Sequence, residues 1–287
     1  MEKQIGIAVF GSFDSYSHMG NWVANSWEDN GHKVTRIDRS NPIPKDGYSM
    51  IIFTDCSEDY SSKITDTKAI KVFWAMDTHM PTGTERSVNI ARKCDIVFST
   101  NYEHGVKLLA KFGIKSNLLP ITYSNRLLGM EAEDIINLDV CMIGNANSAQ
   151  RLDLWNILKA YKSFTGPAKT AQDYVNAMAN SKIVINQPTE PWDIILNNRF
   201  FEALAFGKIL LQKRLKTDLI EKLGFKENQD FIYWDSLDEI PGLVDRALEH
   251  EFDHIGIDNG VHRYSINAQV KKMEDIVISN FYDTINV

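Results

Sequence analysis

The sequence is poor in the features that define several protein classes. It has three cysteines (Cys56, Cys94 and Cys141) among 287 residues and no C-x-x-C pair, which excludes a disulfide framework. No run approaches the roughly 18 apolar residues that a spanning helix needs, and the N-terminus has no signal-peptide pattern. We therefore expect reduced thiols and a soluble, cytoplasmic protein without a membrane partner.

Low-complexity tracts are also absent. Hydrophobic residues make up 44% and charged residues 24% of the chain, values typical of globular proteins, which excludes wholesale disorder and fibrous structure. The length is sufficient for two domains of roughly 140 residues each. The formal net charge of -7 gives no sign of a polyanionic partner held by bulk electrostatics, although a local basic groove stays compatible with it.

Short apolar runs alternate with amphipathic segments of helical length, a pattern typical of parallel strands covered on both faces. We expect strands over residues 5–10, 34–38, 50–55, 70–77, 95–100, 138–142, 182–186, 209–212 and 231–234. Helices are predicted over 21–30, 102–112, 149–161 and 198–206, and from about 238 and 270. The pattern indicates an α/β chain of two doubly wound, Rossmann-like domains, joined across residues 119–137. Such domains bind ligands at the carboxyl ends of their strands.

Polar residues interrupt an apolar helix in the segment DIILNNRFFEALAFGKILLQKR, residues 193–214. Arg199 and Glu202 are three residues apart and share one helix face, with Asn198 beside them near the helix N-terminus. A helix N-terminus with an arginine suits a diphosphate, and a carboxylate one turn later can accept two hydrogen bonds from a ribose diol. An intrahelical ion pair without a ligand is the alternative interpretation.

A second candidate anion site lies in MIGNANSAQRLDLW, residues 142–155. The preceding strand ends at Gly144, and Ser148 is expected to cap a helix three residues before Arg151. Backbone N–H groups and a guanidinium would then face an anion. The spacing matches neither a Walker A loop nor G-x-G-x-x-G, so an ordinary surface arginine is the alternative.

Two segments of the first half place polar residues after predicted strands. The strand IKVFWAMD ends at Asp77, a carboxylate suited to general-base work, and His79 follows. The loop GSFDSYSHMGN, residues 11–21, holds Asp14 and His18, and its glycines would permit close approach of a substrate. A turn-capping Asp77 and a merely exposed His18 are the alternatives.

The sequence HEFDH, residues 250–254, matches the zinc motif H-E-x-x-H, and Glu274 lies where one class of zinc peptidase keeps its third ligand. A helix-ending signal, Asp258-Asn259-Gly260, follows soon afterwards. We interpret the motif as the solvated face of an acidic surface helix. A zinc-dependent hydrolase that uses His250, Glu251 and His254 is the alternative.

The stretch NNRFFEALAFGKILL resembles the donor motif of GT-B glycosyltransferases, especially the spore-maturation-like glycosyltransferases and the DNA β-glucosyltransferases of T-even bacteriophages. In that pattern an arginine and a glutamate hold the nucleotide of a sugar donor, and Arg199 and Glu202 match them. IGNANSAQR is similar to the family's glycine-initiated loop: Arg151 matches its diphosphate-binding arginine, and Asn147 replaces a second one. KVFWAMDTHMP is similar to the phage strand that ends in a catalytic aspartate, here Asp77.

The resemblance implies a GT-B fold with two domains facing a central cleft. Residues 1–125 would form the acceptor side, residues 126–265 would bind the nucleotide-sugar, and a C-terminal helix over 266–287 would pack back towards the first domain. The Glu-x7-Glu pattern of many retaining enzymes is absent, because Ile194 stands eight residues before Glu202, and no Asp-x-Asp motif occurs. The first absence favours an inverting mechanism, and the second disfavours the metal-bound GT-A arrangement.

The implied activity is transfer of a sugar from a nucleotide-diphosphate sugar, with a UDP-sugar favoured, to an acceptor hydroxyl. No further cofactor and no obligate protein partner are expected. Asp77 would be the catalytic base; the donor would be held by Gly144, Asn147, Arg151, Asn198, Arg199 and Glu202, and the acceptor or sugar would contact Asp14, His18 and His79.

The acceptor stays open at this stage. A 5-hydroxymethylpyrimidine in phage DNA, modified in the host cytoplasm, is one hypothesis. A cell-surface glycan, a protein or a small molecule is the alternative within the same reaction class. A non-catalytic nucleotide-binding module is an alternative from another class.

Overall fold

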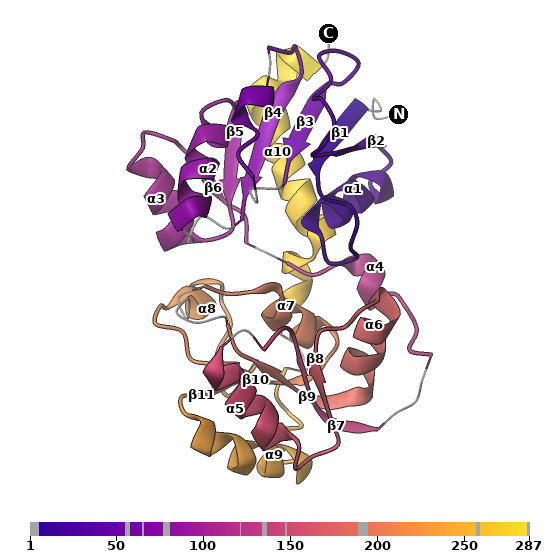
Figure 1. Cartoon of the computed structure of the whole chain (residues 1–287), viewed down its shortest axis with the longest axis vertical. Helices are drawn as coiled ribbons and strands as arrows, with labels where there is room; N and C mark the ends of the chain where they lie inside the picture. Colours follow the sequence, from indigo (N-terminus) through magenta and orange to yellow (C-terminus); the bar gives the residue numbers. More distant parts are fainter. Residues whose placement is uncertain are drawn as a thin grey trace. The chain divides into compact units, whose positions relative to one another are not determined.

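The computed structural model describes residues 6–54, 58–64, 66–76, 81–120, 122–133, 137–146, 148–188, 195–256 and 259–285. Contacts between Cα atoms divide the chain into two units, unit 1 with Met1–Ile121 and Ile266–Val287, and unit 2 with Thr122–Ser265 (Figure 1). Three predicted site residues, Asp77, His79 and Asn147, lie outside the described residues.

Unit 1 is built on a parallel six-stranded sheet in the order β2-β1-β3-β4-β5-β6. Its strands are β1 (Gly6–Gly11), β2 (Lys33–Asp38), β3 (Met50–Phe53), β4 (Ile70–Ala75), β5 (Ile96–Ser99) and β6 (Asn117–Leu118). Its helices are α1 (Met19–Asp29), α2 (Pro81–Ala91), α3 (Lys107–Ala110) and α10 (Ile266–Ile285), with a 3-10 turn at Ser61–Lys63 and a π-helical turn at Tyr102–Val106. Every residue of β3 and β5 is buried, as expected of strands covered on both faces.

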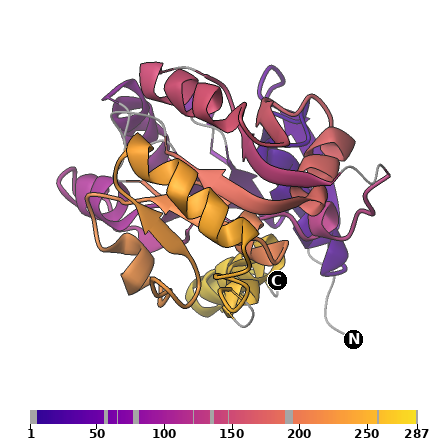
Figure 2. The ribbon, with the colours of Figure 1, turned by 90° about the horizontal axis from the view of Figure 1, so that it is seen from below.

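Unit 2 has a parallel five-stranded sheet in the order β11-β10-β9-β7-β8. Its strands are β7 (Leu138–Ile143), β8 (Ser163–Gly166), β9 (Ser181–Asn186), β10 (Ile209–Lys213) and β11 (Ile232–Trp234). Its helices are α4 (Asn125–Leu128), α5 (Ala149–Leu158), α6 (Ala171–Asn180), α7 (Asn198–Ala205), α8 (Leu219–Lys222) and α9 (Ile240–Leu248), with 3-10 turns at Leu237–Glu239 and Val261–Tyr264. Figure 2 shows α9, in orange, lying across the sheet, where Ile240 and Val244 share a core cluster with Ile183.

Helix α7 is held in unit 2 by a cluster of buried aromatic rings. Phe200 lies with its ring centroid 5.1 Å from that of Phe225 and 5.5 Å from that of Phe231. Phe201 lies 5.3 Å from Tyr264 on the 3-10 turn. Aromatic contacts of this kind add to the burial of apolar surface and fix the orientation of a helix. The apolar residues of NNRFFEALA therefore anchor the helix whose polar residues form the candidate site.

The structure confirms the predicted class of fold, two parallel-sheet α/β domains. Several elements were not predicted, including α2, β6, β8 and α6. The sequences of β8 (SFTG) and α2 (PTGTERSVNIA) contain few large apolar residues, so neither shows a clear hydrophobic pattern. Helix α6 begins at a capping box: Thr170 Oγ1 accepts from Asp173 N, and Asp173 Oδ2 accepts from Thr170 N. The predicted helix over 102–112 starts instead as a π-helical turn, continues as α3 to Ala110 and is followed by a turn that includes Gly113, which has φ +75°.

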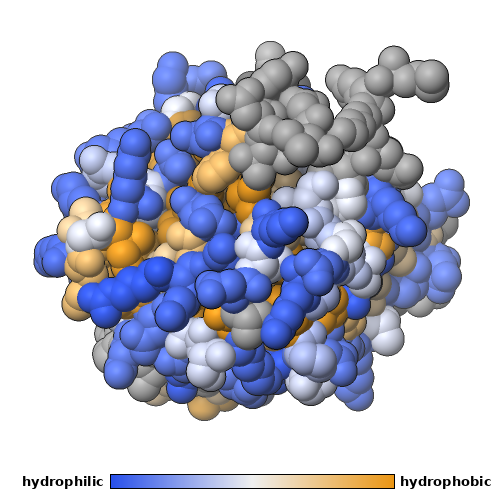
Figure 3. Space-filling model, turned by 90° about the horizontal axis from the view of Figure 1, so that it is seen from above, coloured by the Kyte–Doolittle hydropathy of each residue, from blue (hydrophilic) through white to orange (hydrophobic). Residues whose placement is uncertain are grey.

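The surface visible in Figure 3 is mostly hydrophilic, with hydrophobic residues in small separate areas. None of the described helices has an apolar stretch long enough to cross a lipid bilayer. Two of the three cysteines, Cys94 and Cys141, are free thiols; Cys56 lies outside the described residues.

Candidate active site

The carboxyl ends of β7, β9 and β10 meet at one edge of the unit 2 sheet, because neighbouring strands in a parallel sheet run in the same direction. Gly144 follows β7, Asn186 ends β9, and Gln212 lies near the end of β10. The N-termini of α5 and α7 follow β7 and β9 in the chain. This edge is where ligands bind in doubly wound folds.

Arg151 is buried beneath the loop that follows β7. The predicted helix cap is confirmed, since Ser148 is the N-cap of α5 and its Oγ accepts a hydrogen bond from Arg151 N at 3.3 Å. The guanidinium donates to Asn145 O at 2.7 Å and to Gln187 O at 2.6 Å, and only 8% of Arg151 is exposed. An ordinary surface arginine is therefore excluded.

Gly144 makes this arrangement possible. Its φ is +144°, in a region that side chains rarely adopt, and a Cβ atom there would lie 3.1 Å from Arg151 Nη1. The glycine thus gives the backbone a turn at the end of β7 and leaves room for the guanidinium.

Arg199, Glu202 and Asn198 are brought together on α7, as their spacing predicted, with Tyr174 of α6 as a fourth member. Glu202 is 3% exposed, and its Oε2 accepts from Arg199 Nη1 at 2.7 Å and from the Tyr174 hydroxyl at 2.6 Å. Its Oε1 accepts from Asn198 Nδ2 at 3.0 Å. The Arg199 guanidinium lies over the Tyr174 ring, with Cζ 4.8 Å from the centroid, and Nη1 also donates to the Tyr174 hydroxyl. The intrahelical ion pair is thus present and is part of a larger buried cluster.

The electrostatics of this edge follow from burial. Burial raises the pKa of Glu202, against the opposing effect of the Arg199 charge and of the Tyr174 and Asn198 hydrogen bonds. Burial likewise raises the pKa of Tyr174. Burial lowers the pKa of Arg151, and the positive charge of Arg199 lowers it further. Two largely buried guanidinium groups therefore come from this edge of the sheet, and an anion would stabilise their charged forms.

A network of buried amides at the same edge was not predicted. Asn186 and Asn197 exchange hydrogen bonds of 2.9 and 3.1 Å through their side chains, and Asn186 Nδ2 also donates to Gln212 Oε1 at 2.7 Å. Asn197 is the N-cap residue of α7, yet its side chain gives the helix no capping hydrogen bond. The amides at the ends of the apolar strand sequences KIVIN and ILLQ were the signal that could have revealed this network.

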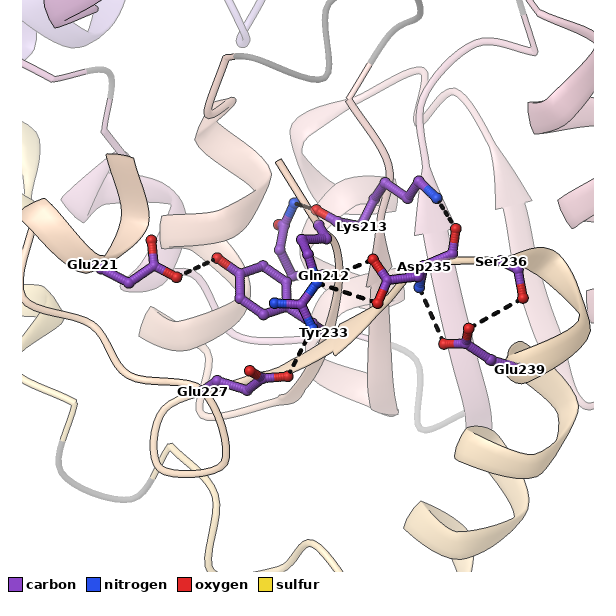
Figure 4. A network of polar contacts seen from close by, with 9 residues as sticks. Gln212, Lys213, Glu221, Glu227, Tyr233, Asp235, Ser236 and Glu239 are labelled. Carbon is purple, nitrogen blue, oxygen red and sulfur yellow. Dashed lines mark hydrogen bonds and ion pairs between the residues drawn. The ribbon is translucent and has the colours of Figure 1, made fainter. Parts of the chain in front are cut away.

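A polar network holds the ends of β10 and β11 (Figure 4). Arg214 donates to Asp235 at 3.0 Å and to Glu227 at 3.2 Å, with Cζ 4.1 Å from the Tyr233 ring centroid. The Tyr233 hydroxyl donates to Glu221 at 2.8 Å. Since two carboxylates already neutralise Arg214, this arginine is a poorer candidate for an anion than Arg151 or Arg199.

In unit 1, Asp14 and His18 lie in the loop between β1 and α1. His18 Nδ1 is 2.8 Å from Asp14 Oδ1, and the two side chains are 39% and 84% exposed. The loop is braced by Asn21, whose amide donates to Phe13 O and Ser15 O. A Cβ at Gly20 would lie 2.8 Å from Ser12 O, so this glycine admits the chain's own carbonyl group. The sequence predicted that Gly20 would make room for a substrate, whereas in the structure the room is taken by the backbone of the loop itself.

The predicted surface helix around the HEFDH motif is wrong. Helix α9 ends at Leu248, and residues 249–256 form turns, with His250 in the left-handed region at φ +67°. His250 Nδ1 is 2.8 Å from Asp253 Oδ2, and Glu251 pairs with Arg246. The zinc hypothesis required both histidines on one face of a helix, and that geometry does not form. Across the described ranges no group of three or more His, Cys, Asp or Glu side chains is arranged to hold a metal ion.

Comparison with known proteins bears on this site. Residues 133–259, most of unit 2, match a family model described as glycosyl transferase-like. The sequence has no significant match among curated proteins.

Solved structures with the same fold include Alr3699/HepE of Anabaena in complex with UDP and glucose, at a TM-score of 0.65 and 11% identity, with 96% of this chain and 100% of that chain covered. Sucrose-phosphate synthase of Thermosynechococcus elongatus has a TM-score of 0.61 and 10% identity, with 98% of this chain and 100% of that chain covered. UDP-GlcNAc 2-epimerase of Neisseria meningitidis, bound to UDP-GlcNAc, has a TM-score of 0.57 and 10% identity, with 96% of this chain and 99% of that chain covered.

At such identities the similarity shows the fold, and the function depends on the site that each chain builds on it. These structures match the chain over both of its units. The predicted pair of Rossmann-like domains therefore agrees with the fold of these proteins. Residues 133–259 of unit 2 thus resemble glycosyl transferase-like proteins, and both units have the fold of these solved structures.

Proposed function

We propose that this protein transfers a sugar from a UDP-sugar to an acceptor hydroxyl with inversion at the anomeric carbon. The structures of the Anabaena protein with UDP and of the Neisseria protein with UDP-GlcNAc support UDP as the donor nucleotide. The finer proposal rests on the carboxyl edge of the unit 2 sheet.

The burial of two arginines at one edge of the sheet is the observation that carries the proposal. Arg151 and Arg199 are both largely buried, and the charge of Arg199 lowers the pKa of Arg151. A diphosphate at this edge would stabilise both guanidinium charges. The N-terminus of α7, where the Asn197 side chain is engaged with Asn186, adds backbone N–H groups and the positive end of the helix dipole.

Glu202 has two tasks in this proposal. Its Oε2 holds Arg199 and Tyr174, so the carboxylate fixes the guanidinium in one orientation. Its Oε1 accepts one hydrogen bond, from Asn198, and a carboxylate oxygen has capacity for a second, which we assign to a ribose hydroxyl. Gly144 and Asn147 would line the diphosphate.

The chemical step is a displacement. Asp77 takes the proton of the acceptor hydroxyl, the acceptor oxygen forms a bond to the anomeric carbon, and the bond from that carbon to the diphosphate oxygen breaks. The leaving diphosphate keeps the electron pair, and Arg151 and Arg199 stabilise the negative charge that develops on it. Asp14, His18 and His79 would contact the acceptor or the sugar.

For the acceptor we propose a 5-hydroxymethylpyrimidine in DNA as the first class to test. The support is the resemblance of KVFWAMDTHMP to the strand of the phage DNA enzymes that ends in an aspartate. Glycans, proteins and small molecules with a free hydroxyl form the second class.

The decisive experiment has two stages. Binding of UDP, GDP, ADP, CDP and TDP is measured by thermal shift on the wild type, on Arg199→Ala and on a matched control, Lys159→Ala, whose side chain contacts Asn156 at the exposed end of α5. We expect a shift with UDP that Arg199→Ala loses and Lys159→Ala keeps. The absence of a shift with every nucleotide at millimolar concentration would overturn the proposal.

The second stage incubates the enzyme and a UDP-sugar with hydroxymethylated DNA, with unmodified DNA and without acceptor. Transfer that needs the hydroxymethyl group supports the DNA acceptor. Conversion of UDP-GlcNAc to its C2 epimer without acceptor would instead indicate the epimerase chemistry that the same fold carries in the Neisseria protein.

A further inference from the structure

Unit 2 has a cavity of about 520 Å³ at the edge of its sheet opposite the proposed donor site. The cavity lies where β9 and β10 begin, at Ser181 and Ile209, and where α6, α7 and α9 end. The donor residues stand at the other ends of the same strands. A ligand in this cavity would therefore be separated from the donor by the length of the sheet.

The lining carries more positive than negative charge. Lys182, Lys208 and His250 line the cavity together with one carboxylate, that of Asp253. The Asp253 carboxylate is engaged with the ring of His250, at 2.8 Å from Nδ1. Lys182 is exposed on β9. The two ammonium groups are thus the dominant charges that a ligand would meet.

Lys208 is fixed in place. Its Nζ donates to Ala179 O at 2.7 Å, near the C-terminus of α6, where the helix dipole favours a cation. An ammonium group has three donors, so this bond leaves donors for a ligand. Burial lowers the pKa of Lys208, which means that the charged form would gain from an anionic partner.

His250 occupies an unusual backbone conformation at the cavity wall. It follows the C-cap of α9 with φ +67°, at a position where glycine is the usual residue. A side chain there costs conformational energy, and such positions concentrate at functional sites. The structure places an imidazole at the wall in spite of that cost.

We propose that this cavity binds a phosphorylated monosaccharide, with the phosphate on Lys182 and Lys208. The volume lies in the range of small-molecule sites and exceeds what a single phosphate fills. The remaining lining combines apolar side chains, among them Ile209 and Ile255, with the amides of Asn137 and Asn180, which suit sugar hydroxyls. Among the described lining residues there is no Phe, Tyr or Trp side chain for stacking a nucleotide base.

The test is isothermal titration of the full chain with glucose 6-phosphate, inorganic phosphate and glucose. Glucose 6-phosphate should bind, and Lys182→Gln should weaken binding about tenfold, the usual effect of removing one charged hydrogen-bond donor. Inorganic phosphate should bind about tenfold more weakly than the sugar phosphate because it leaves the amides unused. Lys208→Gln is the second variant and should also weaken the binding of glucose 6-phosphate. Its melting temperature is measured to show that the variant is folded.

Two controls separate this site from the donor site and from general charge effects. Arg199→Ala and Lys159→Gln should bind glucose 6-phosphate with wild-type affinity. The proposal is overturned if no binding occurs at millimolar concentration, if Arg199→Ala abolishes it, or if Lys159→Gln weakens it as much as Lys182→Gln. Equal affinity for inorganic phosphate and glucose 6-phosphate would overturn the assignment of a sugar.

Discussion

The Tyr174 hydroxyl donates a hydrogen bond of 2.6 Å to Glu202 Oε2, the same oxygen that accepts from Arg199 at 2.7 Å. The contact joins α6 to α7 and places an aromatic ring under the guanidinium. Arg199 is therefore held by a carboxylate, a hydroxyl and a ring. This pre-organisation reduces the entropy that a ligand must offset when it binds the guanidinium.

Tyr174→Phe should weaken UDP binding about three- to tenfold while the fold persists. The change removes two hydrogen bonds to charged groups, the one that the hydroxyl donates to Glu202 and the one that it accepts from Arg199, and keeps the ring under Arg199. Titration with UDP measures the effect. Tyr161→Phe is the matched control. The Tyr161 hydroxyl also donates to a carboxylate, that of Asp245, but at an exposed position. Equal losses in both variants would show that Tyr174 does not position Arg199.

Gly144→Ala should lower stability by about 1–3 kcal/mol and weaken UDP binding, because the backbone is strained and the new methyl group meets Arg151 at 3.1 Å. Gly166→Ala is the control: φ there is +130°, and the nearest atom, Trp155 Cη2, is 4.0 Å from the added carbon. Urea denaturation should show a loss in both variants, and UDP titration a loss in Gly144→Ala alone. Unchanged UDP affinity in Gly144→Ala would contradict the assigned place of Arg151.

Stability should depend on pH through Glu202. Its folded-state pKa is raised above the ordinary carboxyl value of 4.5, with burial as the main cause. When folding raises the pKa of an acid, the unfolded chain releases the proton at a lower pH than the folded chain. The contribution of the group to the free energy of unfolding is therefore complete below about pH 4.5 and is lost as the pH rises through the folded-state pKa. The free energy of unfolding of the wild type, relative to Glu202→Gln, should therefore fall with rising pH. A difference that stays constant or rises would show that Arg199 outweighs burial.

Asp77→Asn should abolish sugar transfer and leave UDP affinity within about twofold of wild type. The amide cannot take the acceptor proton, and removal of a general base typically costs about 10²- to 10⁴-fold in rate. Single-turnover transfer and UDP titration on the same preparation measure both effects. His18→Ala is the comparison: if it stops transfer while Asp77→Asn does not, the base assignment moves to the pair of His18 and Asp14.

Local sequence determined much of this protein by itself. The alternation of apolar and amphipathic segments predicted two parallel-sheet domains, because burial of strands on both faces demands continuous apolar runs. The cap at Ser148 and the shared helix face of Arg199 and Glu202 depend on residues three positions apart, and they formed as expected.

Only the tertiary structure decided the contacts between distant segments. Tyr174 meets Glu202, Arg151 meets the carbonyl of Gln187, and Asn186 meets Gln212 because helices and strands far apart in the chain end at one edge of a sheet. The HEFDH segment shows that local spacing can also mislead. The motif has helical spacing, yet it forms turns, because α9 ends at Leu248 and His250 has a left-handed conformation. Spacing along the chain predicts which residues can share a face, whereas packing decides whether that face forms and what it meets.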